Sequence, residues 1–327
     1  MERKLVVVIN ELTADQKERI KEEALKYGFT PMFFVVRGED PLADKKLADT
    51  VADAEVIFSS LSALAASAGK LKWFCTPFAG VEEYSLPGAF ASPDAVLTNS
   101  SGAYGVTISE HVVMSVLRML RREPEYSSFV AQKKWVRSLP VRSIHGSRIL
   151  LAGTGDIGRE IAKRFKSFDP ASIIGINRHG KNPGGPFDAV FSVEHLDEHL
   201  GEADLIVMSM PGTAETRHLM NAERLSRIHD GAVLINVGRG RCIDEKALAA
   251  ELRSGRLYAA LDVFEKEPLP DDSELWNCPN LCITPHVSGN LTLPYTRNRV
   301  VEMFLENLKL YAEGRPMLRQ IDLKKGY

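Results

Sequence analysis

The sequence predicts an α/β protein of two domains, each with a doubly wound parallel sheet. The chain has 327 residues, and at about 100 to 200 residues per domain this length predicts about two domains. Short runs rich in β-branched and aromatic residues alternate with segments of helical spacing, which is typical of βαβ units around a parallel sheet. A long apolar helix candidate, residues 108–120, separates two such series and is expected to mark a boundary between domains.

The elements follow in order along the chain. The first series holds strand candidates at residues 5–9, 32–36, 56–58, 73–75 and 96–98, and its first helix is expected to bury Ile20, Ala24 and Leu25. The second series holds seven, enough for a full doubly wound sheet, at residues 148–153, 173–177, 189–191, 205–210, 232–237, 258–264 and 281–284. A last helix is expected over residues 291–312, with one face formed by Val300, Met303, Phe304 and Leu308. This helix is too short to form a domain, so we expect it to pack on one of the other two.

The charge balance argues against nucleic acid and membrane partners. Lys and Arg number 41 and Asp and Glu number 43, for a formal net charge of −2, so no basic face is expected. No apolar run approaches the roughly 20 residues of a membrane span, and the N-terminus lacks the apolar region and cleavage site of a signal peptide. We therefore expect a cytoplasmic protein.

The cysteines and paired histidines do not predict a metal site. No CxxC pair is present, and reduced thiols are expected at Cys75, Cys242, Cys278 and Cys282. His195 and His199 have the spacing of two ligands on a helix, but the acidic residues around them indicate a solvated face. We expect no metal.

A glycine-rich turn at residues 153–158 predicts dinucleotide binding. Its sequence, Gly-Thr-Gly-Asp-Ile-Gly, directly follows a strand candidate and opens a helix with one apolar face. The first glycine suits the tight turn, the second lets the backbone approach a pyrophosphate, and the third allows close packing of helix on strand. The residues expected at the cofactor are Gly153, Gly155, Asp156, Ile157 and Gly158. The alternative is a glycine turn with a structural role only.

The end of the next strand favours NADP over NAD. An NAD site usually places a carboxylate about 20 residues after the glycine turn, to bind the ribose 2′-hydroxyl. This chain has Asn177 there, followed by Arg178 and Lys181. The two cations can hold a 2′-phosphate, and Asn177 avoids the repulsion that a carboxylate would cause. The alternative is that they are solvated basic residues in a loop.

Three later segments place an arginine, a glutamate and a histidine just beyond strand ends, where open α/β sheets bind their ligands. They are Arg239 in Asn-Val-Gly-Arg-Gly, Glu267 before Pro268, and His286 after Thr-Pro. Reduction of a 2-keto acid needs all three types. A guanidinium binds the carboxylate as a fork and polarises the carbonyl, an imidazole supplies the proton, and a nearby carboxylate orients the imidazole and favours its charged form. Taken singly, each has a simpler explanation: a surface charge, a turn residue or a core histidine.

Together with the glycine turn and the βα series that follows it, these segments resemble the D-isomer-specific 2-hydroxyacid dehydrogenase family, over almost the whole chain. In that family the arginine lies in N-x-x-R-G, the glutamate precedes proline in D-V-F-x-x-E-P, and the histidine follows T-P. The resemblance implies that Arg239 binds the substrate carboxylate and carbonyl, Glu267 supports the histidine, and His286 donates the proton. Glu265, in the same segment, is then not the catalytic carboxylate.

The resemblance also implies an architecture, in which a Rossmann cofactor domain is inserted in a flavodoxin-like substrate domain. The expected division is residues 1–102 for the first part of the substrate domain, 103–290 for the dinucleotide-binding domain, and 291–327 for a C-terminal helix that returns to the substrate domain. A C2 homodimer is implied through the helix at 108–120 and the connection after it. Trp135 in that connection is a candidate to reach the substrate site of the partner subunit. His111, on the apolar helix, is expected to be a core or interface residue.

Further contacts follow from the same resemblance. The backbone of residues 78–80, at Phe78, Ala79 and Gly80, is expected to offer N–H groups to the substrate carboxylate, with a plain β-to-α turn as the alternative. The remaining cofactor contacts are expected at Pro211 beside the adenosine, at Val237, Gly238 and Asp262 beside the nicotinamide carboxamide, and at Ser288 and Gly289.

The leading functional prediction is an NADP-dependent reductase of small 2-keto acids, such as glyoxylate or hydroxypyruvate, that forms the D-hydroxy acid. One alternative is a dinucleotide-sensing binding protein of the corepressor type, against which the presence of Arg239, Glu267 and His286 argues. A second is a related dehydrogenase for formate, which is expected to hold a neutral amide in place of Glu267.

Overall fold

The computed structural model describes residues 2–323 and divides them into two compact units. The described residues up to Ala103, together with those from Leu291 onward, form the first, which we call the five-stranded unit. Tyr104–Asn290 forms the second, the seven-stranded unit. The two ends of the predicted segments 1–102 and 291–327, residue 1 and residues 324–327, lie outside the described residues.

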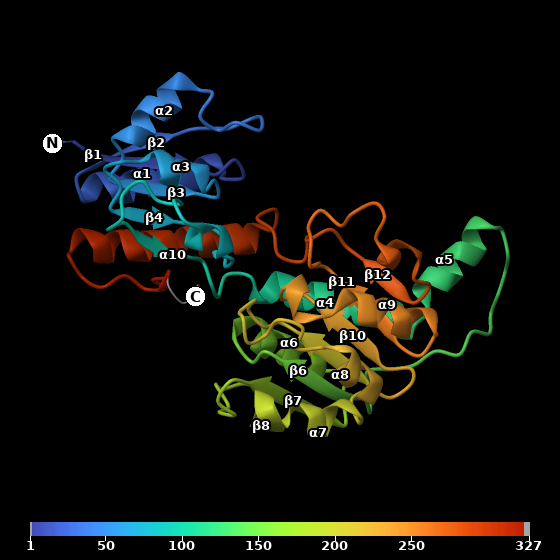
Figure 1. The fold of residues 1–327 in the computed structure, drawn as a ribbon. Coiled ribbons are helices and arrows are strands. Elements are labelled where there is room, and N and C mark those ends of the chain that lie inside the picture. The colour runs from blue at the N-terminus through green and yellow to red at the C-terminus, as the bar shows by residue number, and fades with distance from the viewer. Residues whose placement is uncertain (1, 324–327) are drawn as a thin grey trace. The chain divides into compact units, whose positions relative to one another are not determined.

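The five-stranded unit has a parallel sheet in the order β2-β1-β3-β4-β5 (Figure 1), the flavodoxin-like order. Its strands are β1 Arg3–Val8, β2 Phe29–Phe33, β3 Val56–Ser59, β4 Trp73–Cys75 and β5 Val96–Thr98. Its helices are α1 Ala14–Lys26, α2 Lys45–Ala52, α3 Ala63–Ser67 and α10 Pro294–Ala312, with the 3₁₀ turn η1 Glu82–Ser85.

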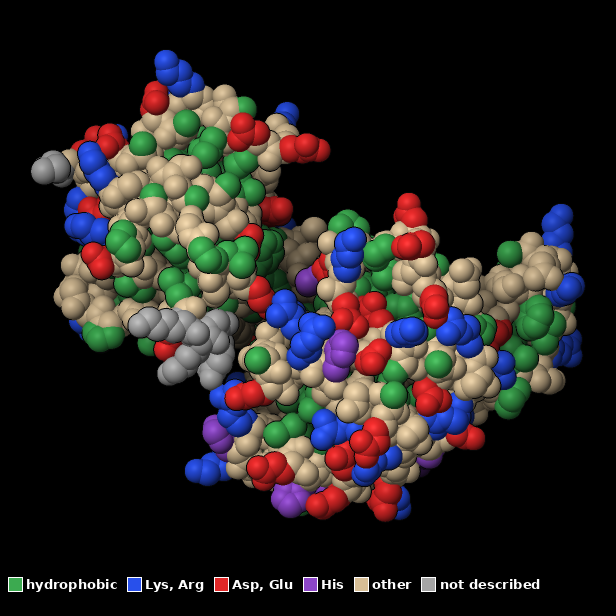
Figure 2. Space-filling view, viewed as in Figure 1, with side chains coloured by type: hydrophobic (Ala, Val, Ile, Leu, Met, Phe, Trp, Pro, Cys, Tyr) green, Lys and Arg blue, Asp and Glu red, His purple; other side chains and the backbone are tan. Residues whose placement is uncertain are grey.

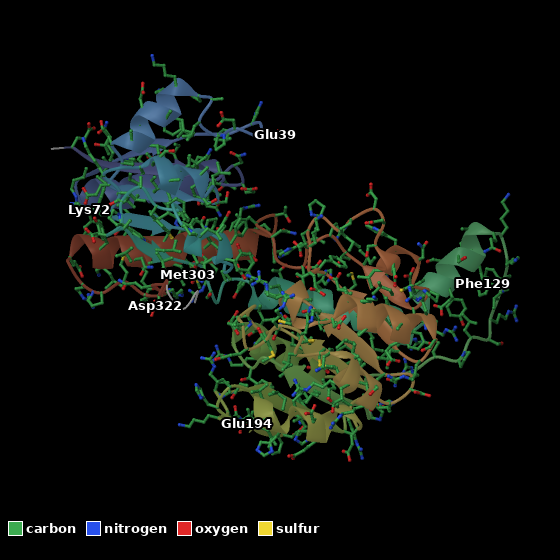
Figure 3. All side chains as sticks on the ribbon, viewed as in Figure 1. Glu39, Lys72, Phe129, Glu194, Met303 and Asp322 are labelled. Carbon is green, nitrogen blue, oxygen red and sulfur yellow. The ribbon has the colours of Figure 1, made fainter. Side chains whose placement is uncertain are left out.

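The last helix completes the core of this unit. The apolar face predicted for it is confirmed, since Val300, Met303, Phe304 and Leu308 are all buried. The ring of Phe304 stacks on that of Phe58 in β3 at 4.2 Å between centroids and on Trp73 in β4 at 5.3 Å. Figure 3 shows the side chains of α10, among them Met303, beside the sheet of the same unit. A helix from the end of the chain therefore covers a sheet built from its beginning.

Two details predicted for this unit are wrong. The second strand spans Phe29–Phe33, three residues earlier than predicted, and it includes Pro31. Because β2 is at the edge of the sheet, a residue without a backbone N–H is tolerated there. Leu25 was expected in the buried face of the first helix, but it is 56% exposed, while Ile20 and Ala24 are buried.

The seven-stranded unit has a parallel sheet in the order β12-β11-β10-β9-β6-β7-β8, the Rossmann order extended by a seventh strand. Its strands are β6 Arg148–Ala152, β7 Ser172–Asn177, β8 Ala189–Ser192, β9 Leu205–Met208, β10 Val233–Asn236, β11 Tyr258–Leu261 and β12 Leu281–Ile283. Its helices are α4 Gly105–Leu120, α5 Glu123–Ala131, α6 Asp156–Lys166, α7 Leu196–Leu200, α8 Ala222–Arg227 and α9 Glu245–Arg253, with 3₁₀ turns η2 Val193–His195, η3 Gly240–Cys242 and η4 Glu274–Asn277. The predicted fold class is confirmed, although β9 and β11 end two and three residues earlier than expected.

Helix α5 was not predicted. It follows α4 after a sharp change of direction at Arg122, whose φ is 55°. Every residue of this helix, including Phe129 labelled in Figure 3, is at least partly exposed in the described chain. The helix carries no apolar stripe that a sequence pattern would detect.

The surface and the thiols agree with the composition. Figure 2 shows Lys and Arg side chains interspersed with Asp and Glu side chains over the face in view. Each of the four cysteines is buried and in the thiol form.

Among residues 2–323, no group of three or more His, Cys, Asp or Glu side chains could hold a metal ion. None of the helices described in that range is long and apolar enough to cross a membrane.

Candidate active site

The glycine turn between β6 and α6 is closely packed at two of its glycines and open at the third. Gly153 has a φ of 107°, which favours glycine, and its N–H bonds to the carbonyl of Ile176 at 2.9 Å. A Cβ on Gly158 would lie 2.0 Å from the Gly153 carbonyl oxygen, so only glycine lets helix and strand pack this closely. Gly155 is the N-cap of α6, and a Cβ there would meet open space. No side chain at Gly155 crowds the start of α6, which begins with Asp156 and Ile157. An anion can therefore approach the backbone N–H groups of the first turn.

Asn177 builds the turn that carries the two predicted phosphate ligands. Its Oδ1 accepts the backbone N–H groups of His179 and Gly180 at 3.0 and 2.7 Å. Its Nδ2 donates to Thr154 Oγ1 in the glycine turn and to the carbonyl oxygen of Lys181, both at 2.8 Å. The end of β7 is thereby fixed against the glycine turn. The side chain of Arg178, which leaves this turn, is 47% exposed and forms an ion pair with Glu215.

His286 and Glu267 form a direct pair. The Nδ1 atom of His286 lies 2.6 Å from Oε2 of Glu267, and Oε1 of the same carboxylate accepts the N–H of Phe264 at 2.9 Å. An ionised carboxylate only accepts hydrogen bonds, so Nδ1 donates and Nε2 is the nitrogen left to deliver a proton. The side chains are 49% and 35% exposed, so the pair is reachable from solvent.

Asp262 holds the turn on which His286 lies. His286 has a φ of 53°, in the left-handed region that side chains with a Cβ rarely adopt. Asp262, at the end of β11, accepts the N–H of His286 on its carbonyl oxygen at 2.8 Å and the N–H groups of Val287 and Ser288 on its carboxylate, both at 2.9 Å. Burial raises the pKa of Asp262, but hydrogen bonds from Ser288, Thr284 and Val287 outweigh it and hold the pKa below its ordinary value. A buried carboxylate thus stabilises the unusual backbone of the histidine.

Arg239 reaches the same region because its loop packs on the loop after β11. A Cβ on Gly240 would lie 1.8 Å from the carbonyl carbon of Phe264, so the two backbones touch at a position where only glycine fits. The Arg239 carbonyl oxygen accepts from Asn236 Nδ2 at 2.9 Å, which secures the loop to the end of β10. Strands β10, β11 and β12 are neighbours in the sheet, so their carboxyl ends bring the three predicted catalytic loops together.

The other predicted cofactor residues lie at the same edge of the sheet. Val237 and Gly238 continue β10, and Pro211 follows β9. Ser288 is buried, with Gly289 next to it, just after the histidine turn. The contacts expected of these residues with the cofactor stay predictions.

The predicted substrate loop belongs to the other unit. Phe78 is 39% exposed, and its N–H bonds to Thr76 Oγ1 at 3.3 Å. The carbonyl oxygen of Ala79, before Gly80, accepts from Asn99 Nδ2 at 2.8 Å. The loop is therefore held within its own unit.

The sequence did not predict the partners of two groups near the site. Nε2 of His111, on α4, lies 3.2 Å from Thr284 Oγ1, which itself donates to Asp262 Oδ1 at 2.6 Å. Burial lowers the pKa of His111, although the charge of Asp262 opposes this. The sequence predicts a core or interface position for His111 on the apolar helix, but it does not predict the contact with Thr284.

The second group surrounds Glu265. Its Oε2 lies 3.0 Å from Nε2 of His218, and Glu265 and Glu245 each accept the other's backbone N–H. Burial and the charges of Glu265 and Glu267 raise the pKa of Glu245. Glu265 thus has its own histidine and serves to hold the loop, while Glu267 two residues later pairs with His286.

Comparisons with known proteins identify the family of the chain. Residues 113–288 match the family model described as D-isomer specific 2-hydroxyacid dehydrogenase, NAD binding domain. A glyoxylate/hydroxypyruvate reductase B of Citrobacter koseri is 32% identical over 260 residues, 78% of this chain and 79% of the relative. A crystal structure of a D-isomer specific 2-hydroxyacid dehydrogenase family protein from Aeromonas salmonicida has a TM-score of 0.84 at 34% identity, over 99% of this chain and 100% of that one.

A further structure is described with its cofactor. The D-isomer specific 2-hydroxyacid dehydrogenase from Xanthobacter autotrophicus, in complex with NADPH and MES, has a TM-score of 0.76 at 28% identity, with both chains covered completely. The fold, the glycine turn, the histidine–glutamate pair and these matches lead to one conclusion. The chain belongs to the D-isomer specific 2-hydroxyacid dehydrogenase family and is an NAD(P)-dependent oxidoreductase of that family.

Proposed function

We propose that the protein reduces a small 2-keto acid, such as glyoxylate or hydroxypyruvate, to the D-hydroxy acid, with NADPH as the preferred reductant. The observation that carries this proposal is the 2.6 Å contact between His286 Nδ1 and Glu267 Oε2, beside the loop of Arg239. Such a pair suits a proton donor that must be charged when hydride arrives at the carbonyl carbon. The name of the Citrobacter koseri relative supports the substrate class.

Each side chain has a distinct proposed role. Arg239 binds the substrate carboxylate as a fork and polarises the carbonyl. His286 delivers the proton from Nε2 to the carbonyl oxygen, and Glu267 orients the ring and favours its charged form. We propose that the seven-stranded unit binds the dinucleotide and that the backbone of residues 78–80 contributes to substrate binding. Bound NADPH would supply the hydride.

The proposal is tested by adding keto acids to the protein with NADPH or NADH and following the cofactor's absorbance. Glyoxylate and hydroxypyruvate should oxidise NADPH, and His286→Ala should lower turnover by about 10²- to 10⁴-fold while NADPH binding stays nearly intact. NADPH binding without oxidation by any 2-keto acid would instead favour a dinucleotide-sensing protein. A His286→Ala variant with near-normal turnover would remove the histidine from the mechanism.

The NADPH preference rests on Arg178 and Lys181 and is supported by the NADPH complex of the Xanthobacter autotrophicus relative. Arg178→Ala should weaken NADPH more than NADH. A charge-assisted contact contributes about 1.5 to 3 kcal/mol, so the preference should fall by roughly 10- to 150-fold. Equal affinity of the unmodified protein for both cofactors would contradict this choice.

We further propose a homodimer formed through α4 and the connection between α4 and β6. In the single chain the side chains of Val130 and Trp135 in this connection are 73% and 86% exposed, and exposed apolar surface of this kind is typical of an interface. Light scattering should give twice the 36.2 kDa mass of the chain. Trp135→Glu should weaken the dimer, whereas Trp276→Glu, at another exposed tryptophan, should not. A monomer mass at micromolar concentration would reject the dimer.

The cytoplasmic location expected from the sequence stays a prediction.

A further inference from the structure

The ion pair between Arg178 and Glu215 joins two loops on either side of the glycine turn. Strand β6, which leads into that turn, lies between β7 and β9 in the sheet. Arg178 follows the end of β7, and Glu215 lies in the loop after β9, 37 residues later. The sequence places no carboxylate at the end of β7, but the fold brings one there from the neighbouring loop.

Arg178 and Glu215 each lie in a loop that is fixed by internal hydrogen bonds. On the β9 side, the buried Oγ1 of Thr216 donates to the carbonyl oxygen of Pro211 at 2.7 Å and accepts the N–H of Thr213 at 2.8 Å. Glu215 directly precedes Thr216, so its backbone is positioned by this closed loop. On the β7 side, Asn177 closes the turn that carries Arg178. The ion pair therefore follows from two ordered loops.

The position of Glu215 matters because of the charge that each cofactor would bring. A 2′-phosphate bound by Arg178 must take over guanidinium donors that now bind Glu215, and it must lie beside that carboxylate's negative charge. The 2′-hydroxyl of NADH carries no charge and can donate to a carboxylate. The same side chain therefore opposes one cofactor and tolerates the other.

We propose that Glu215 is a specificity-determining residue that competes with the 2′-phosphate of NADPH for Arg178 and so limits the preference for NADPH over NADH. This inference rests on the proposed cofactor role of Arg178. The two side chains are 47% and 72% exposed, so the ion pair is a weak one. Losing the competition should strengthen NADPH binding by up to about fivefold.

The test measures dissociation constants of NADPH and NADH for the full chain without substrate, by fluorescence of the bound reduced cofactor. Glu215→Gln, which removes the charge and keeps the shape, should tighten NADPH binding by about two- to fivefold and leave NADH unchanged or weaker. Glu223→Gln is the matched control, because its ion pair with Arg227 has nearly the same exposure, 46% and 71%. It should change neither constant.

The Arg178→Ala variant separates failure of the inference from failure of the proposed cofactor choice. If Arg178→Ala weakens NADPH but Glu215→Gln does not tighten it, the competition is overturned and the cofactor choice stands. If Arg178→Ala changes neither cofactor, the cofactor choice itself fails. In the double variant the effect of Glu215→Gln should be smaller than in the single variant, because only the repulsion between the carboxylate and the phosphate is then removed. Its full persistence there would mean that Glu215 acts directly on the phosphate, which would also overturn the competition.

Discussion

The carboxylate of Glu267 connects the imidazole of His286 to the backbone of Phe264, because Oε2 contacts the ring nitrogen at 2.6 Å while Oε1 accepts the amide at 2.9 Å. One side chain thus orients the ring, selects the nitrogen that carries the permanent proton, and secures the ring to the loop on which Arg239 packs. Loss of its charge and loss of its position therefore have different consequences.

Glu267→Gln should lower kcat/KM for keto-acid reduction and leave the dissociation constant of NADPH unchanged. A neutral amide stabilises a charged imidazole less than a carboxylate does, so the proposed proton donation from His286 should slow down, by less than in His286→Ala because the amide still positions the ring. Glu265→Gln, whose carboxylate pairs with His218, is the control and should keep the parent's kcat/KM. A Glu267→Gln variant as active as Glu265→Gln would contradict the proposed role of the pair.

Arg239→Lys should impair the use of the keto acid but not the binding of the cofactor. Lysine keeps the charge but loses the planar fork, so kcat/KM for the keto acid should fall by roughly 10- to 150-fold, the equivalent of about 1.5 to 3 kcal/mol. The dissociation constant of NADPH should stay the same. Arg241→Lys, in the same loop, is the matched variant, and an equal loss there would take the role away from Arg239.

Gly240→Ala should damage both stability and activity. Its Cβ would lie 1.8 Å from the Phe264 carbonyl carbon, so the arginine loop and the loop after β11 must separate. Overpacking of this kind costs about 1 to 3 kcal/mol of unfolding free energy. Gly69→Ala is the control, since a Cβ there meets nothing within 4 Å. Denaturant unfolding and kcat/KM measure the two effects, and a Gly240→Ala enzyme as stable and active as Gly69→Ala would contradict the close packing.

The His111→Gln variant should lose less stability than the parent protein as the pH falls. Burial lowers the pKa of His111 in the folded protein, so below about pH 6.5 the unfolded chain binds a proton there that the native protein does not. The parent must therefore lose stability as pH falls from about 6.5 to the lowered native pKa. The variant should lose less over that window. Melting temperatures of both proteins between pH 7 and pH 5 measure this, and parallel curves would mean that His111 is not buried in neutral form.

The sequence predicted the strands and the contact between Glu267 and His286 where a local pattern carries the information. Every strand candidate of the second series lies in the seven-stranded sheet, because each is an apolar run bounded by turn residues. The second strand of the chain was misplaced since Pro31 argues against a strand unless its position at the sheet edge is known. That position depends on the order of the strands, which is tertiary information.

The site divides in the same way. Arg239, Glu267 and His286 each lie in a short motif, so the sequence identifies them. Glu215 and His111 contact partners 37 and 173 residues away, and no local spacing indicates either contact. Contacts that support the candidate site depend on the packing of distant loops, whereas the three proposed catalytic side chains each lie in a short motif.

The ring of Phe304 completes the core under Phe58 and Trp73, and this has a consequence for synthesis on the ribosome. The strands of the five-stranded unit are made first, but their covering helix emerges only after Tyr104–Asn290 has been translated, which takes on the order of ten to forty seconds. During that interval the nascent sheet exposes an apolar face that chaperones can hold. The seven-stranded unit has its whole sequence available earlier, so the part of the chain that is made first is the part whose core is completed last in the order of synthesis.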